Sequence, residues 1–235
     1  MLSSFILYHL MKYFLFRRGT SATQQTKMIV DFSVVIKCLL TAGLLLISHN
    51  GHAQKTTCTY EIMRNNKTIG NVKTCIVRNS DQVKYLVETH VIVSFLIDVK
   101  VDIRLSSTYV AGELREAGMV RTVNGVSRIN NHIVWQNGRY LFIDMEGDTS
   151  YSSHPIYNSI STLYFLEPNS LQKIFSENFL QSIPVKDLHN GNYLLELPDG
   201  HKNYYRYQKG ICREVEMETP LSTVFLRLKS SSPQP

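Results

Sequence analysis

Residues 54–229 are predicted to form an all-β fold, a single-domain antiparallel meander curled into an open or closed barrel. Two features indicate this fold: turn dipeptides recur at short intervals, and apolar and polar residues alternate between them. Alternation with a period of two is typical of strands that bury one face and expose the other. Because each strand is twisted relative to the next, a sheet of ten or more strands is expected to curl.

The turn signals are mainly Asn-Gly and Asp-Gly pairs, whose tolerance of positive φ angles fits two-residue hairpins. They stand at Asn124-Gly125, Asn137-Gly138, Asn190-Gly191 and Asp199-Gly200, with Lys209-Gly210 as a weaker fifth. Short turns of this kind make consecutive strands antiparallel neighbours.

The alternation is clearest between residues 83 and 105. Val101, Ile103 and Leu105 fall on one face, while Lys100 and Asp102 fall on the other. The same pattern along the chain predicts strands at 56–64, 68–78, 82–95, 97–110, 113–123, 126–136, 139–146, 180–188, 192–197, 201–208, 211–218 and 222–229.

One segment departs from this pattern. His154-Pro155 is a suitable helix entry, and apolar residues then recur at helical spacing from Ile156 to Phe165, until Pro168 ends the element. A second short helix or a strand is expected between Leu171 and Phe179. The fold prediction therefore includes one or two short helices packed against the opening of the barrel.

The predicted helix has two interpretations. Its apolar stripe either completes the core or forms a lid over a ligand cavity. In the second case Leu163, Tyr164, Phe165 and Glu167 are the candidate ligand-binding residues. Leu163 and Tyr164 then face inward, and Glu167 holds the end of the helix at the barrel rim.

The region before residue 54 has the features of a secretory signal peptide. Lys37 is followed by an apolar run that reaches Ile47, and then by the small-x-small sequence that ends at Ala53. The apolar run is shorter than the ~20 residues needed to cross a bilayer. We therefore interpret 28–53 as a signal peptide, 1–27 as an extension upstream of the true start, and 230–235 as a disordered tail; Met1 and Met28 both stay open as the start.

Charge argues against a nucleic-acid partner. The chain has 25 basic and 19 acidic side chains, a net charge of +6. Five of the basic residues and one acidic residue precede Gln54, which leaves 20 basic and 18 acidic side chains and a net charge of +2. Most of the excess positive charge thus lies in the predicted leader and not on the folded domain.

Three cysteines follow the leader: Cys58, Cys75 and Cys212. Cys58 and Cys75 flank a predicted turn at Asn65-Asn66, so a disulfide between these two adjacent strands is a candidate. Register decides it, because a slip of one residue places the two sulfur atoms on opposite faces of the sheet. Cys212 is interpreted as a buried small residue and not as a nucleophile.

The sequence has no strong catalytic motif, and it points to no cofactor and no resident metal. Gly-x-Ser-x-Gly, His-Glu-x-x-His, phosphate-binding glycine loops and paired Cys-x-x-Cys are all missing from it. Asp144, Glu146 and Asp148 are spaced so that they could bind Ca²⁺, but they lack the order of a helical calcium loop. A solvated strand end is the favoured interpretation of these three residues.

Several short motifs together resemble a family of secreted proteins from Bacteroidetes-type bacteria whose domain has no known function. The motifs are Tyr60-Glu61-Ile62, Ile69-Gly70, Leu163-Tyr164-Phe165-x-Glu167-Pro168, Phe175-Ser176-Glu177, Leu197-Pro198-Asp199-Gly200 and Tyr205-x-Tyr207. The resemblance spans about Thr57 to Leu228. It implies a signal peptide, and it marks Leu163, Tyr164, Glu167, Pro168, Ser176 and Glu177 as positions of interest without a role.

We expect an exported periplasmic or cell-envelope protein, peripherally associated with the envelope, that binds an apolar or amphiphilic small molecule in the concavity of its sheet. A structural or interaction module without a ligand is the first alternative. An outer-membrane barrel is a weaker one, because such barrels need an outward apolar band and long outer loops, whereas the predicted turns are short. An enzyme and a nucleic-acid-binding protein are disfavoured, and the oligomeric state is not specified.

The leader leads to a first prediction. If it is removed after Ala53, protein recovered from the cell envelope should begin at Gln54, in part cyclised to pyroglutamate. Mass spectrometry of the intact protein and of its N-terminal peptide measures this directly. Recovery of a chain that begins at Met1 or Met28 would show that the leader is retained.

Overall fold

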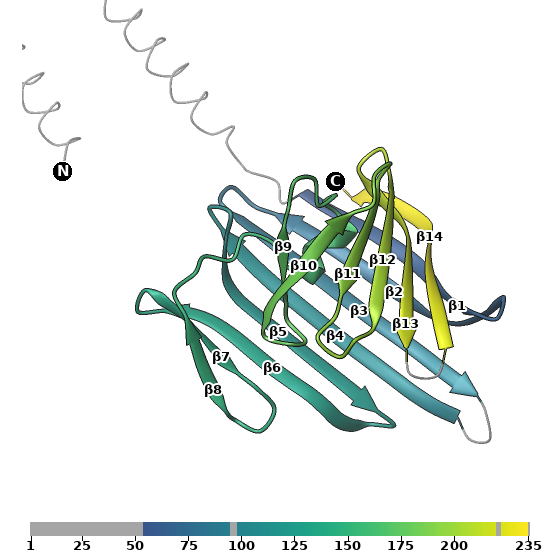
Figure 1. Ribbon diagram of the computed structural model, residues 1–235, viewed down its shortest axis with the longest axis horizontal. Helices are drawn as coiled ribbons and strands as arrows, with labels where there is room; N and C mark the ends of the chain where they lie inside the picture. The colour runs from purple at the N-terminus through teal and green to yellow at the C-terminus, as the bar shows by residue number, and fades with distance from the viewer. Residues whose placement is uncertain (1–53, 95–97, 220–221, 235) are drawn as a thin grey trace, which may run out of the picture. The chain divides into compact units, whose positions relative to one another are not determined.

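The structure is a computed structural model that describes residues 54–94, 98–219 and 222–234. These residues form one antiparallel sheet of fourteen strands (Figure 1). The strands are β1 (Gln54–Arg64), β2 (Lys67–Arg78), β3 (Gln82–Ser94), β4 (Asp98–Val110), β5 (Glu113–Val123), β6 (Val126–Gln136), β7 (Arg139–Ile143), β8 (Thr149–Ser152), β9 (Lys173–Ser176), β10 (Gln181–Asp187), β11 (Asn192–Glu196), β12 (Lys202–Gln208), β13 (Ile211–Thr219) and β14 (Ser222–Gln234). The predicted all-β antiparallel fold is confirmed.

The order of the strands shows two meanders joined in the middle of the sheet. It runs β8-β7-β6-β5-β4-β3-β2-β1-β14-β13-β12-β11-β10-β9, so the only neighbours that are distant in sequence are β1 and β14. We call β1–β8 the first arm and β9–β14 the second arm. Strands β8 and β9 are the two ends of this order and are not paired with each other, so the sheet is an open one.

The two arms face each other because the sheet curls. In Figure 1 the strands β9–β13 of the second arm lie across the face of β2–β5 of the first arm. Contacts between the arms confirm this arrangement: the Asn131 side-chain amide on β6 donates to the carbonyl oxygens of Glu177 and Asn178, which follow β9, at 2.9 Å each. The concave side of the sheet therefore encloses the interior.

The interior holds two groups of buried apolar side chains. One lies where β1–β4 meet β11–β14 and includes Tyr60, Leu195 and Val215. The other lies between β2–β7 and the start of the second arm, and it includes Leu114 and Phe175. The alternation predicted for residues 83–105 explains these groups, because one set of side chains on each strand points into the concavity.

Three of the five predicted two-residue turns form, at Asn124-Gly125, Asn137-Gly138 and Lys209-Gly210. The turns around Asn190-Gly191 and Asp199-Gly200 are longer, because the nearest paired residues are Asp187 with Tyr193 and Glu196 with Lys202. Asn124, Gly125, Asn137 and Gly138 all have positive φ angles, between 49° and 79°. These angles are the ones that a two-residue hairpin requires, and an Asn-Gly pair adopts them with little strain.

The predicted helix over Ile156–Phe165 is wrong. Among the described residues, only a five-residue 3-10 helix, η1 (Ile160–Tyr164), occurs in this segment. The carbonyl of Ile156 accepts from the Leu114 N–H at 2.9 Å, and that of Asn158 accepts from the Phe175 N–H at 3.1 Å. These two carbonyls are therefore used to join the connection to both arms, and they are not available to an α-helix.

Two further differences concern strands. The segment 171–179, for which a helix or a strand was open, contains β9, and a short strand β8 also forms. The predicted disordered tail at 230–235 is wrong for 230–234, because β14 continues to Gln234 and pairs with β1. The predicted signal peptide and N-terminal extension lie outside the described residues.

The inward and outward faces of β2 lead to a prediction on stability. Val72 is 1% exposed in the interior, while its neighbour Lys73 is exposed on the other face. Val72→Asn should cost about 3 kcal/mol, because it removes apolar burial and leaves an amide without partners. Lys73→Asn should cost less than about 1 kcal/mol. Urea denaturation of both variants measures the difference, and equal losses would mean that β2 has no outward face.

Candidate functional site

A cavity of about 370 Å³ lies inside the curled sheet. This volume is within the range of small-molecule binding sites. Most of its wall is aliphatic and comes from both arms. The apolar lining residues are Ile62, Ile69, Val72, Val87, Val91, Val93, Val101, Ile103, Leu105, Met119, Ile160, Phe179, Leu197, Met217, Val224 and Leu226.

The aliphatic wall follows from the alternation along β3 and β4. Val91 pairs with Val101, and Thr89 pairs with Ile103, so these inward side chains form rows across the sheet. Branched aliphatic residues suit such a pleated surface. Their outward neighbours include Lys100, which lies outside the cavity wall. The predicted inward face of β4 is thus the floor of the cavity.

The connection between the arms forms a roof over part of this cavity. Ile160 and Tyr164 of η1 line it, together with Ser176, Glu177 and Asn178 at the end of β9. Two contacts fix η1 to the first arm: the Ser107 and Ser161 hydroxyl groups form a hydrogen bond, and the Tyr109 hydroxyl donates to Ser159 Oγ at 2.9 Å. Buried hydrogen bonds between hydroxyl groups therefore hold the segment that contains η1 in place over the cavity.

Glu177 is the acidic residue of the cavity wall. Its side chain is 1% exposed, and its Oε1 accepts from the Ser161 N–H at 3.4 Å. Its Oε2 has no hydrogen-bond partner. Burial raises the pKa of this carboxyl above its ordinary value, and hydrogen bonds from Ser159 and Ser161 offset only part of that effect. The carboxyl is thus driven toward its neutral form.

Two arginines also line the cavity, Arg64 at the end of β1 and Arg121 on β5. Both are half-buried, and the Nε atom of each is buried without a hydrogen-bond partner. Neither arginine was among the ligand-binding residues predicted from the sequence. The available signal was their inward parity, since Arg121 lies two residues from inward-facing Met119 and Arg64 two residues from Ile62.

Of the four predicted ligand-binding residues, only Tyr164 lines the cavity. Leu163 is 1% exposed within the core, and Phe165 packs against Tyr85 with ring centroids 6.0 Å apart. Glu167 lies outside the cavity wall, where its Oε1 accepts from the Tyr193 hydroxyl at 3.0 Å. Ser176 and Glu177, which the family resemblance marked, do line the cavity.

The candidate disulfide between Cys58 and Cys75 does not form. All three described cysteines are free and buried. Cys58 pairs with Thr74 across β1 and β2, so Cys75 points to the other face of the sheet. Cys212 is fully buried, and burial raises the pKa of its thiol to about 12, which leaves it protonated and unreactive at neutral pH.

The three acidic residues considered as Ca²⁺ ligands, Asp144, Glu146 and Asp148, belong to a turn. Asp144 Oδ1 accepts from the N–H groups of Glu146 and Asp148 at 3.0 and 2.9 Å. Within residues 54–94, 98–219 and 222–234, no group of three His, Cys, Asp or Glu side chains is placed to hold a metal ion. In the same residues, no helix has the length and apolar character needed to span a membrane.

The fold and cavity define a class: a β-barrel-like protein whose curled, open sheet encloses a mostly apolar cavity. The family model for the "Domain of unknown function (DUF6134)" matches residues 60–229, so the chain belongs to this family. This confirms the prediction of a domain of unknown function, while the bacterial group and the signal peptide remain predictions.

The solved structures provide a match at the level of fold. The crystal structure of the beta-barrel-like protein of domain of unknown function DUF1849 from Brucella abortus is similar, with a TM-score of 0.53. The two share 9% sequence identity, and the match covers 77% of this chain and 98% of that one. At this identity the likeness concerns the fold alone. A search of curated proteins found no match.

The buried carboxyl leads to a prediction on pH. Because burial raises the pKa of Glu177, the folded state holds this proton to higher pH than the unfolded chain does. The contribution of this bound proton to the free energy of unfolding is fully present below pH 4.5, the ordinary pKa of a glutamate carboxyl. It is lost as pH rises through the pKa of Glu177 in the folded state. Glu177→Gln removes this dependence.

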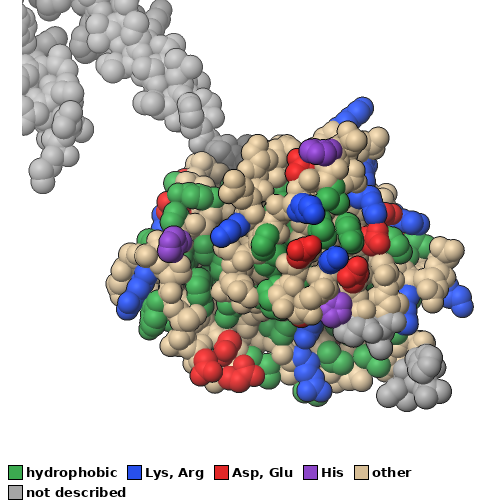
Figure 2. Space-filling view, in the orientation of Figure 1, with side chains coloured by type: hydrophobic (Ala, Val, Ile, Leu, Met, Phe, Trp, Pro, Cys, Tyr) green, Lys and Arg blue, Asp and Glu red, His purple; other side chains and the backbone are tan. Residues whose placement is uncertain are grey.

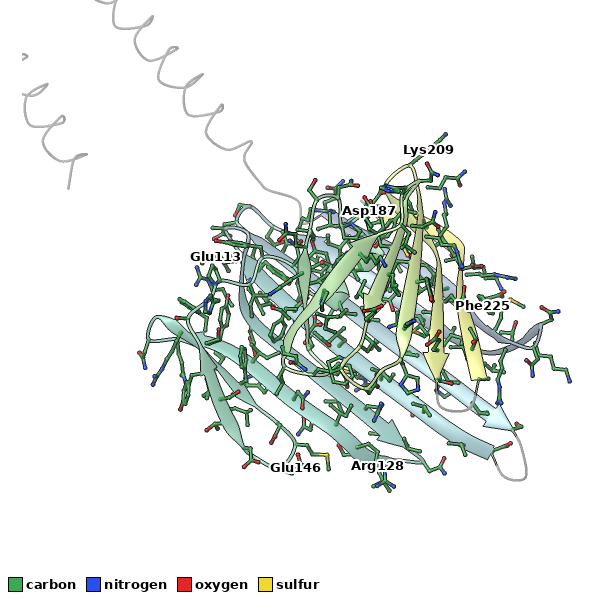
Figure 3. The ribbon with its side chains drawn as sticks, in the orientation of Figure 1. Glu113, Arg128, Glu146, Asp187, Lys209 and Phe225 are labelled. Carbon is green, nitrogen blue, oxygen red and sulfur yellow. The ribbon has the colours of Figure 1, made fainter. Side chains whose placement is uncertain are left out.

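The free energy of unfolding of both proteins, measured with urea from pH 4.5 to 8, tests this. The difference between them should shift in favour of the Gln variant as pH rises. Glu146→Gln is the matched control, because Glu146 is exposed at the edge of the molecule (Figure 3). A difference between wild type and Glu177→Gln that stays constant with pH would contradict the prediction.

Proposed function

We propose that this protein binds an apolar or amphiphilic small molecule in the cavity enclosed by its sheet, and that it does so as an exported protein of the periplasm or cell envelope. The cavity is the observation that carries the proposal. It offers about 370 Å³ of space on the concave side of the sheet, and most of its wall is aliphatic. A concave, mostly apolar pocket with a few polar groups in its wall is typical of small-molecule binding sites.

The position of the cavity supports binding over a packing defect. Its walls come from strands of both arms and from η1, and polar contacts hold that roof in place. A ligand that fills it would cover the aliphatic side chains of its wall, at roughly 25 cal/mol for each Å² removed from water. The site is thus formed before the ligand arrives, which keeps the cost of ordering low.

Export rests on the sequence of residues 28–53, which has the basic, apolar and small-residue regions of a signal peptide. The alternative of an envelope module without a ligand differs from the proposal only in whether the cavity is occupied. On the face shown in Figure 2, basic and acidic side chains are interspersed, which favours neither alternative and offers no continuous basic surface to a nucleic acid.

The outer-membrane alternative is less well supported. Membrane barrels carry apolar side chains outward toward lipid and polar ones inward. The described strands have the opposite arrangement, as in β3, where Val87 and Val91 line the cavity while Lys84 and Glu88 are exposed.

A fluorescent probe tests the proposal. Titration with the neutral apolar dye N-phenyl-1-naphthylamine should give saturable binding to the wild-type protein. Val91→Trp should weaken this binding at least about tenfold, because its indole occupies the cavity. Thermal unfolding should confirm that the variant is folded.

The control is Ile92→Trp, one residue along the same strand. Ile92 is 42% exposed on the outer face, so its variant should bind the dye as the wild type does. Native mass spectrometry of gently purified protein should also show a bound small molecule. Dye binding that is unaffected by Val91→Trp would place the dye elsewhere and remove the support for the cavity.

A further inference from the structure

The polar atoms of the cavity extend the proposed function to the class of ligand. In the described part of the chain, four buried side-chain nitrogen or oxygen atoms have no hydrogen-bond partner: Arg64 Nε, Arg121 Nε, Glu177 Oε2 and Asn178 Oδ1. All four residues line this one cavity. A buried polar group without a partner costs about 1–3 kcal/mol, and folded proteins contain few of them. Their concentration in one place indicates a site for polar groups of a ligand.

The charges of the cavity select the sign of the ligand. Its charged lining residues are Arg64, Arg121 and Glu177. Neither arginine forms an ion pair with a carboxylate of the described residues, so both cations are uncompensated. Glu177 is one acidic group against two guanidinium groups, so it cannot cancel both of them, and burial raises its pKa. The cavity is therefore suited to an anion and not to a cation.

The register of the sheet places several of these groups together. Met119 on β5 pairs with Asn131 on β6, and Asn131 holds the carbonyl groups of Glu177 and Asn178. Arg121 is two residues from Met119 on the same face, and both line the cavity. The Arg121 guanidinium and the 177–178 turn thus lie on the same side of the cavity, whereas Arg64 is on β1, separated from β5 by three strands.

We propose that the ligand is an anionic amphiphile, with an apolar chain along the aliphatic wall and a carboxylate or phosphate group bound by Arg121 beside the 177–178 turn. This inference rests on the proposed function. The N–H groups of the Arg121 guanidinium donate to the anion, as their geometry suits both carboxylate and phosphate. The Glu177 carboxyl supplies a further donor in its protonated form, and Asn178 Oδ1 accepts from a hydroxyl group of the ligand or from water.

Four amphiphiles with the same chain test this: dodecanoate, dodecyl phosphate, dodecan-1-ol and dodecyltrimethylammonium. Each is titrated against the complex of N-phenyl-1-naphthylamine with the wild-type protein, below its micellar concentration. At least one of the two anions should displace the dye at a concentration at least about tenfold lower than the alcohol or the cation. If dodecanoate displaces the dye at a lower concentration than dodecyl phosphate, the site prefers a carboxylate, and the reverse order indicates a phosphate.

Arg121→Gln should reduce this preference, while dodecan-1-ol should displace the dye from this variant as it does from the wild type. Arg128→Gln is the matched control. It makes the same change of charge, but Arg128 is exposed at the lower edge in Figure 3 and lies outside the cavity wall, so the preference should be unchanged. The wild-type comparison of head groups stands even where a variant fails to fold.

The outcomes separate this inference from the proposed function. Dye binding with equal displacement by all four amphiphiles, or with the cation strongest, would overturn the anionic ligand and leave the binding cavity intact. The four polar atoms would then be hydrated. A protein that binds neither the dye nor any of the four amphiphiles would overturn the proposed function, and the inference with it.

Discussion

The antiparallel pairing of β1 with β14 is the interaction on which the rest of the structure depends. It is the strand pairing that joins the two meanders into one sheet, and it runs from Lys55 opposite Gln234 to Met63 opposite Phe225. Because this pair lies in the middle of the strand order, the normal twist of a sheet turns the arms toward each other on both sides of it. The concave interior and its cavity are consequences of that geometry.

The connection between β8 and β9 uses polar groups to hold a loop in an apolar interior. A buried loop must satisfy its backbone groups, and here the carbonyls of Ile156 and Asn158 accept from one arm each. Tyrosine hydroxyls act in the same way, since Tyr207 donates to the Leu163 carbonyl at 2.6 Å. The segment therefore has little regular helix, and yet η1 is fixed firmly enough to form part of a cavity wall.

The buried polar groups near η1 form hydrogen bonds within the protein, and several of those in the cavity wall do not. Around η1, the hydroxyl groups of Ser107, Ser159 and Ser161 bond to one another and to Tyr109. The partnerless polar atoms of the described residues are instead found on side chains that line the cavity. The polar groups of the loop around η1 thus have partners within the protein, whereas those of the cavity wall do not. We infer from this difference that the polar groups of the wall bind a ligand.

Local patterns in the sequence were enough to predict twelve of the fourteen strands, three of the five two-residue turns and the inward parity of residues such as Val101 and Ile103, because these depend on local periodicity and on positive φ angles in the turns. The sequence also marked Tyr164 and Glu177 through the family resemblance. It could not determine the pairing of β1 with β14, the offset that separates Cys58 from Cys75, or the loss of the predicted helix at 156–165. These depend on register and on hydrogen bonds between distant segments, and no local pattern encodes them. The grouping of Arg64, Arg121 and Glu177 around one cavity has the same origin, since only the curl of the sheet brings β1, β5 and the end of β9 together.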